Sequence, residues 1–421
     1  MIVFKFGGAS ISTADRIRQT SEIIRQEAAK PLLVVVSALG KTTNALEEVV
    51  NAYFDGRLEE ARNQFDTICK HHVEIARELG VAESTGNALN NVFTEVSWLL
   101  HDKPTGTYDY CYDQVVCSGE LMSTVIVSHY LNSRGIRNNW IDIRDVLRTD
   151  DNFRDAAIDW AYTAVKTEEL VRPPLSGAGI VVTQGFIGAT DENESTTLGR
   201  EGSDYTAAAF ANLLDAEGLT IWKDVAGVMN ADPKKFPEAV VMERLSFNEV
   251  IEMAYYGAQV IHPKTIKPLQ NKGIPLHVRC FLKPELPGTL ISRQQVQNLP
   301  PVVILKENQV LIRFRMKDFS FIGEEGVANL YACFAEAKIS PNIIQSGAIG
   351  MWCGFDDKPD KISRLALKTE EHFDVLVEKG LTLLTIRHYR SEQANKMSAG
   401  KEIILLQQTG ETVQLLMKDR N

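Results

Sequence analysis

The feature that most constrains this chain is the alternation of short apolar runs with helical stretches through residues 1–283. The apolar runs are rich in Ile, Val and Leu: Ile2–Phe6, Leu32–Val36, Trp140–Ile143, Ile180–Thr183 and Leu219–Trp222. Polar or glycine-containing loops follow them, and then helical spacing resumes. Strands separated by helices pair in parallel through right-handed crossovers. The pattern therefore predicts an α/β fold, a three-layer αβα sandwich whose loops at the carboxyl ends of the strands carry the site.

Length and charge limit the number of domains and the kinds of partner that this chain can have. The chain has 421 residues, which exceeds one typical core, and its net charge of −10 argues against nucleic acid or an anionic membrane as a partner. No apolar run reaches membrane-spanning length, and the opening MIVFKF lacks the basic head of a secretory signal. The six cysteines form no CxxC pair. We expect a cytoplasmic protein with reduced thiols.

The first glycine loop is a candidate phosphate site. Gly7 and Gly8 directly follow the run Ile2–Phe6 and precede a helical pattern. A glycine turn between strand and helix presents backbone N–H groups to phosphate oxygens. Lys5 precedes the turn and is placed to extend along those phosphates. The alternative is a tight connection with an exposed lysine.

The loop after the second apolar run resembles part of a P-loop. Gly40-Lys41-Thr42 matches the end of the Walker A pattern, but Val35 stands where the first glycine is required. We therefore prefer a loop whose hydroxyls, on Ser37 and Thr43, face a small polar substrate. A simple polar turn is the alternative.

Two further stretches carry charged groups at predicted helix starts. Glu120 lies just inside an apolar helix, where it either complements the helix dipole or receives a substrate ammonium. Arg200 stands between glycines, so its guanidinium is a plausible clamp for a carboxylate or phosphate. Ser203 is predicted to cap the next helix, and Asp204 suits its positive end. An ordinary surface loop with a cap is the alternative.

Basic residues after the last predicted strand offer a further wall for a nucleotide. Lys223 and Asp224 follow Leu219–Trp222, and Lys234 lies in the next polar turn. By contrast, His71-His72 is interpreted as solvated helix surface and not as a metal pair. The ligands of any metal ion are not identified by the sequence.

The remainder of the chain predicts a second domain. Four prolines mark residues 284–301 as a linker between residues 1–283 and 302–421. Beyond it, the order strand, helix, two strands, helix, strand between Val310 and Glu378 is ferredoxin-like. A second unit, from Leu381 to Met417, leaves little room for its helices.

These motifs together resemble a known family. The segments KFGGAS, SALGKTTN, SGELMS, TLGREGSDYTAA, IWKDVAGV and YGAQVIHPKT occur in that order and are similar to those of aspartate kinases, in the amino acid kinase family. The tail resembles the ACT regulatory module. The resemblance implies transfer of the ATP γ-phosphoryl group to the side-chain carboxylate of L-aspartate, with Mg²⁺, as the first step of lysine, threonine and methionine synthesis.

The resemblance also assigns roles near the phosphates. Lys5 would neutralise charge on the transferring phosphoryl group, and the N–H groups of Gly7 and Gly8 would hold its oxygens. Asp204 would orient Lys5. The residues implied to form the nucleotide wall are Lys223, Asp224 and Lys234.

On the amino-acid side, the resemblance implies that Arg200 binds the α-carboxylate and that Glu120 takes the ammonium. Recognition would be completed by Ser37, Thr43 and Ser203. A homodimer is expected, with an amino-acid effector at the junction of the ACT regions. Residues 342–348 differ from the acidic residue and Ser-Glu pair of lysine-sensitive relatives, which argues against lysine as that effector.

Three alternatives stay open. Another amino acid kinase, acting on a glutamate derivative, carbamate or a nucleotide, would share Lys5 and the glycines but lack the pair SGELMS and GREGSD. A P-loop NTPase would need the glycine that is missing at Val35. A non-catalytic amino-acid sensor would keep the ACT half and tolerate loss of Lys5.

Overall fold

The computed structural model describes residues 1–177 and 179–419, which divide into two compact units. The first unit comprises Met1–Val228, Val241–Ile251 and Gln259–Val296; the second comprises Met229–Val240, Glu252–Ala258 and the chain from Gln297 onward. The predicted linker, 284–301, therefore does more than connect the two, because its middle forms a strand of the first unit. The prolines mark this segment as a linker, but they do not indicate that part of it forms a strand in the sheet.

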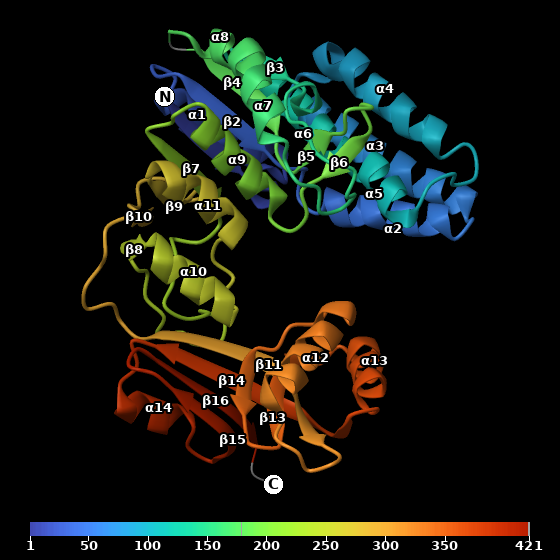
Figure 1. The fold of residues 1–421 in the computed structure, drawn as a ribbon. Helices are drawn as coiled ribbons and strands as arrows, with labels where there is room; N and C mark the ends of the chain where they lie inside the picture. Colours follow the sequence, from blue (N-terminus) through green and yellow to red (C-terminus); the bar gives the residue numbers. More distant parts are fainter. Residues whose placement is uncertain (178, 420–421) are drawn as a thin grey trace. The chain divides into compact units, whose positions relative to one another are not determined.

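The first unit is built on an eight-stranded sheet with the order β3-β4-β2-β1-β7-β9-β10-β8 (Figure 1). Its strands are β1 (Ile2–Phe6), β2 (Leu32–Val36), β3 (Asn139–Ile141), β4 (Ile180–Gln184), β7 (Gly218–Lys223), β8 (Arg244–Ser246), β9 (Leu276–Cys280) and β10 (Thr289–Ser292). Every pairing is parallel except that of β10 with β9. The largely parallel sheet is confirmed.

The register of the central strands brings their carboxyl ends to one edge. Phe6 of β1 pairs with Val36 of β2 and with Trp222 of β7, and Val36 pairs with Gln184 of β4. The chain adds β2 on one side of β1 and β7 on the other. In such sheets ligands bind beyond the carboxyl ends, where the strand order reverses. The ends of β1 and β7 are therefore the expected ligand crevice.

Helices of the first unit cover this sheet and extend beyond it. They are η1 (Gly8–Ile11), α1 (Ala14–Gln26), α2 (Thr42–Phe54), α3 (Leu58–Glu78), α4 (Ala82–Leu99), α5 (Tyr108–Val116), α6 (Ser118–Ser133), η2 (Ile143–Asp145), α7 (Trp160–Lys166), η3 (Thr167–Val171), α8 (Arg172–Leu175), α9 (Gly202–Leu213) and α11 (Pro263–Lys272). A further helix, α10 (Phe247–Tyr256), begins in the first unit and ends in residues assigned to the second. The helix α6 packs on β2, β3 and β4, while α9 packs on β1, β2 and β7. Both helices are apolar on nearly all sides and almost wholly buried.

Two features of this unit differ from the sequence predictions. A small hairpin, β5 (Ile187–Ala189) with β6 (Ser195–Thr197), interrupts the loop between β4 and α9. The prediction that His71-His72 is solvated surface is wrong for His72, which is fully buried on α3. Its Nδ1 lies 2.8 Å from the Ile68 carbonyl oxygen, and burial lowers its pKa to about 4.

The second unit contains one six-stranded antiparallel sheet with the order β12-β13-β11-β14-β16-β15. Its elements are β11 (Val302–Met316), α12 (Gly323–Glu336), β12 (Ile343–Ser346), β13 (Gly350–Asp356), α13 (Pro359–Thr369), β14 (Phe373–Arg387), α14 (Ser391–Met397), β15 (Lys401–Gln408) and β16 (Thr412–Asp419). The ferredoxin-like order of the first half is confirmed, and the second half has one short helix, α14. The long strands β11 and β14 run through both halves and join them into one sheet.

Within residues 1–177 and 179–419, no helix combines the length and apolar character needed to cross a bilayer. All six cysteines are free thiols.

Candidate active site

A cavity of about 500 Å³ lies at the carboxyl edge of the first unit's sheet. It is lined by Lys5, Ser37, Thr43, Tyr112, Glu120, Arg154, Phe186, Thr197, Gly199, Arg200, Glu201, Gly202, Ser203, Asp204 and Lys223. These residues come from the ends of β1 and β7, the loop after β2, the helices α2, α5 and α6, the loop between η2 and α7, and the segment from β4 through the first turn of α9. The parallel register explains their convergence, because each loop leaves the sheet at the same edge.

Lys5 and Asp204 form a buried ion pair in this cavity. Lys5 Nζ lies 2.6 Å from Asp204 Oδ1, and Lys223 Nζ lies 3.9 Å from Asp204 Oδ2. Burial works against charge on Asp204, but the two lysines dominate and hold its pKa below the usual value. Lys223 also donates to the Val260 carbonyl oxygen at 2.9 Å. Two cations held at the end of adjacent strands suit a polyanionic ligand.

Glu120 is a buried carboxylate with one unused oxygen. Its Oε1 accepts a hydrogen bond from the Ala38 N–H at 3.2 Å, whereas Oε2 has no hydrogen-bond partner among the described residues. Burial raises the pKa of Glu120 to about 8. A buried carboxylate without a partner is costly, so a ligand cation beside it would be bound favourably.

The loop that follows β1 packs directly on the loop that follows β2, and glycines make the contact. A Cβ on Gly8 would lie 2.6 Å from the Gly40 carbonyl oxygen and 2.8 Å from that of Ala38. The Gly40 N–H also donates to the Gly8 carbonyl oxygen at 3.0 Å. Gly7 approaches Lys5, since a Cβ there would lie 3.3 Å from Nζ. The glycines thus hold the Lys5 loop against the Ser37 loop, and their contact with phosphate stays a prediction.

At the start of α9, the structure corrects the predicted cap. Glu201 occupies the N-cap position in a left-handed conformation, with φ of 55°, and no side chain caps this helix. Ser203 lies inside the first turn, where its Oγ instead accepts a hydrogen bond from Ser37 Oγ at 2.9 Å. The two predicted substrate hydroxyls are therefore neighbours.

Arg200 is solvent-exposed at the cavity and has no ion-pair partner among the described residues. Its guanidinium is thus available to a ligand carboxylate.

Two predicted nucleotide contacts do not line this cavity. Asp224 is exposed beyond the end of β7, and Lys234 belongs to the second unit, where its N–H donates to Asp232. Neither is among the described lining residues. Their nucleotide roles stay predictions.

Five lining side chains were not predicted from sequence: Tyr112, Arg154, Phe186, Thr197 and Glu201. Phe186 and Arg154 both have positive φ values, near 70°. A left-handed bulky residue is rare and frequently marks a functional position, but φ cannot be read from sequence.

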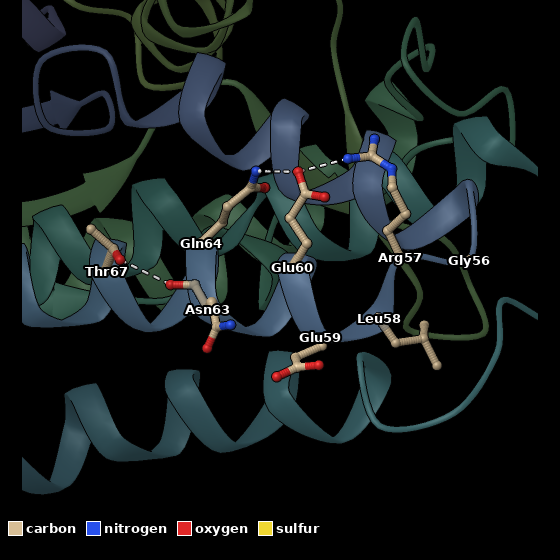
Figure 2. A pocket seen from close by; sticks show the side chains of 8 residues that line it. All are labelled: Gly56, Arg57, Leu58, Glu59, Glu60, Asn63, Gln64 and Thr67. Atoms are coloured by element: carbon tan, nitrogen blue, oxygen red, sulfur yellow. Dashed lines mark hydrogen bonds and ion pairs between the residues drawn. The ribbon is translucent and has the colours of Figure 1, made fainter.

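A second hollow, on the surface at the start of α3, has a different character (Figure 2). Its polar side chains already pair with one another: Arg57 and Gln64 both contact Glu60 Oε1, at 2.6 and 3.2 Å. No buried charge faces it. It therefore offers no set of convergent groups for chemistry.

The described residues contain no group of three or more His, Cys, Asp and Glu side chains able to hold a metal ion. Asp204, a carboxylate that lines the cavity beside Lys5, is already engaged by Lys5 and Lys223. The donor set does not fit a protein-held magnesium ion.

Comparison with known families decides the assignment. Residues 1–280 match the amino acid kinase family. The chain is also 30% identical over 414 residues to lysine-sensitive aspartokinase 3 of Escherichia coli K12, covering 96% of this chain and 90% of that protein. The chain belongs to the amino acid kinase family, among the aspartokinases.

Solved structures agree with this placement. E. coli aspartokinase III in complex with aspartate and ADP, in its R-state, is 28% identical and superposes with a TM-score of 0.85, covering 99% of this chain and 96% of that one. The T-state of E. coli aspartokinase III, with lysine and aspartate bound, matches with a TM-score of 0.78 at 28% identity, covering 99% and 95%. This aspartokinase chain is accordingly an ATP-dependent kinase.

Proposed function

We propose that this chain transfers the γ-phosphoryl group of ATP to the side-chain carboxylate of L-aspartate, giving 4-phospho-L-aspartate and ADP. The observation that carries the proposal is one cavity that holds two kinds of charged group. It is lined by the ion-paired Lys5, Lys223 and Asp204, and also by Glu120, which has one unpaired oxygen. The aspartokinase relatives support aspartate as the acceptor.

The chemistry requires no general base. The acceptor carboxylate is already ionised at neutral pH, so catalysis depends on alignment and on neutralisation of charge. Lys5 is preorganised for this task, because its ion pair with Asp204 holds the ammonium in place. Lys223 contacts the same carboxylate.

Amino-acid recognition uses the remaining polar groups. The exposed guanidinium of Arg200 would bind the α-carboxylate in a bidentate manner, and Glu120 would receive the α-ammonium. The hydroxyls of Ser37 and Ser203, already hydrogen-bonded to each other, would complete the contact with Thr43.

Magnesium enters this scheme as the counterion of the nucleotide. Because the described residues form no carboxylate cage, the ion would be held by the ATP phosphates and water, as Mg²⁺ commonly is. No step is assigned to a magnesium ion bound by the protein.

The test is a coupled ADP-release assay with L-aspartate, L-glutamate and N-acetyl-L-glutamate, each with and without lysine or threonine. We expect turnover with L-aspartate and far less with the other two acceptors. Preferred turnover of a glutamate derivative would instead assign another branch of the amino acid kinase family. ATP-dependent activity with none of them, but binding of lysine or threonine, would favour the non-catalytic sensor.

For the second unit, we propose an amino-acid effector and a homodimer. Lysine sensitivity is a property of the E. coli relative, but here the Asn342 side chain is occupied by Lys306 Nζ at 2.7 Å and Asp356 Oδ1 at 2.9 Å. Large apolar side chains such as Phe321 and Leu376 are exposed on this unit, as expected of a surface that pairs with a second copy. Analytical ultracentrifugation with and without each amino acid tests both parts.

A further inference from the structure

Arg154 adopts a backbone conformation that its side chain disfavours. Its φ is 70°, in the left-handed region, which costs a residue with a Cβ about 1–2 kcal/mol. Glycine would adopt this conformation without that cost. Such residues persist where the surroundings fix them, and they concentrate at functional sites. The presence of arginine therefore suggests a role for its side chain.

The main chain of Arg154 is fixed by Asp113. The Arg154 N–H donates to Asp113 Oδ2 at 3.0 Å. The same carboxylate accepts from the Thr197 N–H at 2.8 Å and, through Oδ1, from the Thr197 hydroxyl at 2.7 Å. Asp113 is fully buried on α5. It thus ties the Arg154 loop and strand β6 to one wall of the cavity.

The side chain of Arg154 lies over aromatic rings at that wall. Its guanidinium carbon is 4.3 Å from the centroid of the Tyr112 ring and 5.4 Å from that of Tyr108. Its ion pairs are long, at 3.3 Å to Asp109 and 3.4 Å to Glu47, and all three side chains are well exposed. Exposed pairs of this kind are weak. A ligand carboxylate could take their place while the stacking on Tyr112 keeps the guanidinium oriented.

The position of this wall indicates which anion it would meet. Tyr112, Glu120 and Arg154 line the same cavity. Glu47 lies one helical turn after Thr43 on α2. Lys5 and Lys223 instead mark the ends of the strands. In an amino acid, the α-carboxylate and the ammonium are attached to one carbon, so an ammonium bound at Glu120 brings the α-carboxylate into the cavity that Arg154 also lines.

We propose that Arg154 is a second guanidinium of the acceptor site, which binds the α-carboxylate of the amino-acid substrate together with Arg200. This inference rests on the proposed function. It makes Arg154 a determinant of acceptor specificity, and it assigns Asp113 as the positioning residue beneath it.

The main test compares Arg154→Gly with the wild type, because glycine retains the observed backbone conformation without strain. We expect the KM for L-aspartate to rise about tenfold or more, the loss of one charge-assisted contact, with kcat changed less than about twofold. In the variant, the KM for ATP should stay near the wild-type value, and the melting temperature should not fall. Arg154→Lys keeps the charge but not the planar fork, so its KM for L-aspartate should lie between those of the wild type and Arg154→Gly.

The matched control is Arg148→Gly. Arg148 also lies over an aromatic ring, with its guanidinium 3.7 Å from the Tyr162 centroid, but it is not among the described lining residues. The KM of Arg148→Gly for L-aspartate should equal that of the wild type. An unchanged KM in Arg154→Gly, or an equal rise in the Arg148 variant, would overturn the inference.

A chemical probe separates recognition from a merely structural role. L-Isoasparagine keeps the side-chain carboxylate but carries an amide in place of the α-carboxylate. Removing Arg154 should weaken the binding of L-aspartate strongly and the binding of L-isoasparagine little. A structural defect would weaken the binding of both compounds alike, and that result would exclude the proposal.

Calorimetric titration of L-aspartate distinguishes this inference from the proposed function. Binding to the wild type that is lost in Arg154→Gly, without any ADP release, would refute the kinase activity but support the role of Arg154. Equal binding to both proteins, or no binding to the wild type, would refute the role of Arg154.

Discussion

Lys5 Nζ lies 2.6 Å from Asp204 Oδ1, and fewer than one-tenth of each residue's surface is exposed. The pair joins the end of β1 to the first turn of α9. A buried ion pair of this kind adds little net stability relative to apolar residues, but removing one partner alone leaves an uncompensated charge. Its value is that it presents the Lys5 ammonium in a fixed position.

Replacing Lys5 separates catalysis from stability. Lys5→Met should lower kcat by about 10²–10³-fold, since it removes charge stabilisation made in the transition state. It should also lower the melting temperature, because the buried Asp204 would keep only its longer contact with Lys223, at 3.9 Å. The double variant Lys5→Met/Asp204→Asn should recover stability but not kcat.

The matched control for this experiment is Lys30→Met. Lys30 forms an exposed pair with Glu27 at 3.3 Å. Both kcat and the melting temperature should stay near wild-type values, because exposed pairs contribute about 0–1 kcal/mol. Wild-type turnover in Lys5→Met would rule out the proposed role of Lys5.

Replacing Arg200 should affect the amino acid and not the nucleotide. Arg200→Ala should raise the KM for L-aspartate by about tenfold to a hundredfold, as expected for loss of a bidentate contact to a carboxylate. The melting temperature should not change, because the guanidinium has no ion-pair partner among the described residues. Steady-state kinetics with each substrate varied in turn measures this, and an effect on ATP alone would contradict the assignment.

The pKa of Glu120 makes aspartate binding depend on pH. Its pKa, raised by burial to about 8, means that the free protein carries a neutral Glu120 near pH 7. Only the ionised form pairs with an ammonium, so the KM for L-aspartate should fall as pH rises from about 6.5 to about 8.5. In Glu120→Gln the KM should be higher and independent of pH over this range. A pH-independent KM in the wild type would argue against Glu120 as the ammonium site.

The same residue predicts a change in stability with pH. The folded-state pKa of Glu120 lies above its ordinary value of 4.5. Relative to the unfolded chain, its contribution to stability is therefore fully present below pH 4.5 and is lost as pH rises through about 8. The melting temperature of Glu120→Gln should thus rise relative to that of the wild type as the pH increases from mildly acidic to mildly alkaline. This is measured without ligands.

The contact between Gly8 and Gly40 predicts a steric effect. An added Cβ at Gly8 would meet two backbone carbonyl oxygens, so Gly8→Ala must displace one loop. We expect a loss of about 1–3 kcal/mol in the free energy of unfolding and a large loss of kcat. In the control Gly86→Ala, the new Cβ meets nothing within 4 Å inside α4, and stability should rise by about 0.5–1 kcal/mol. Chemical denaturation of both variants measures the difference.

The sequence was sufficient for those site residues that adjoin strand ends. Lys5, Ser37 and Lys223 could be placed together because parallel strands end at one edge, and their hydrophobic runs are unmistakable. Glu120 could be placed because it lies in the first turn of an apolar helix that opens with a glycine-containing motif.

The Asp113 contacts could not have been predicted. Asp113 reaches Arg154 and Thr197, which are 41 and 84 residues away in the chain. No period or motif relates those positions. The β5–β6 hairpin was missed for a similar reason: Ser195–Thr197 is a buried strand made only of hydroxyl residues, and its burial depends on Asp113 and on Gln114, which accepts from the Ser195 N–H at 3.1 Å. Tertiary hydrogen bonding, and not hydrophobic pattern, determines this element.

The two strands of 15 residues, β11 and β14, belong to both halves of the second unit. Any cut between those halves would sever two hydrogen-bonded backbones at once and expose their ends. A recombinant fragment that contains only one ferredoxin-like half would therefore lack half of its own central strands. An exchange of regulatory regions between aspartokinases would therefore have to transfer the whole six-stranded sheet as one unit.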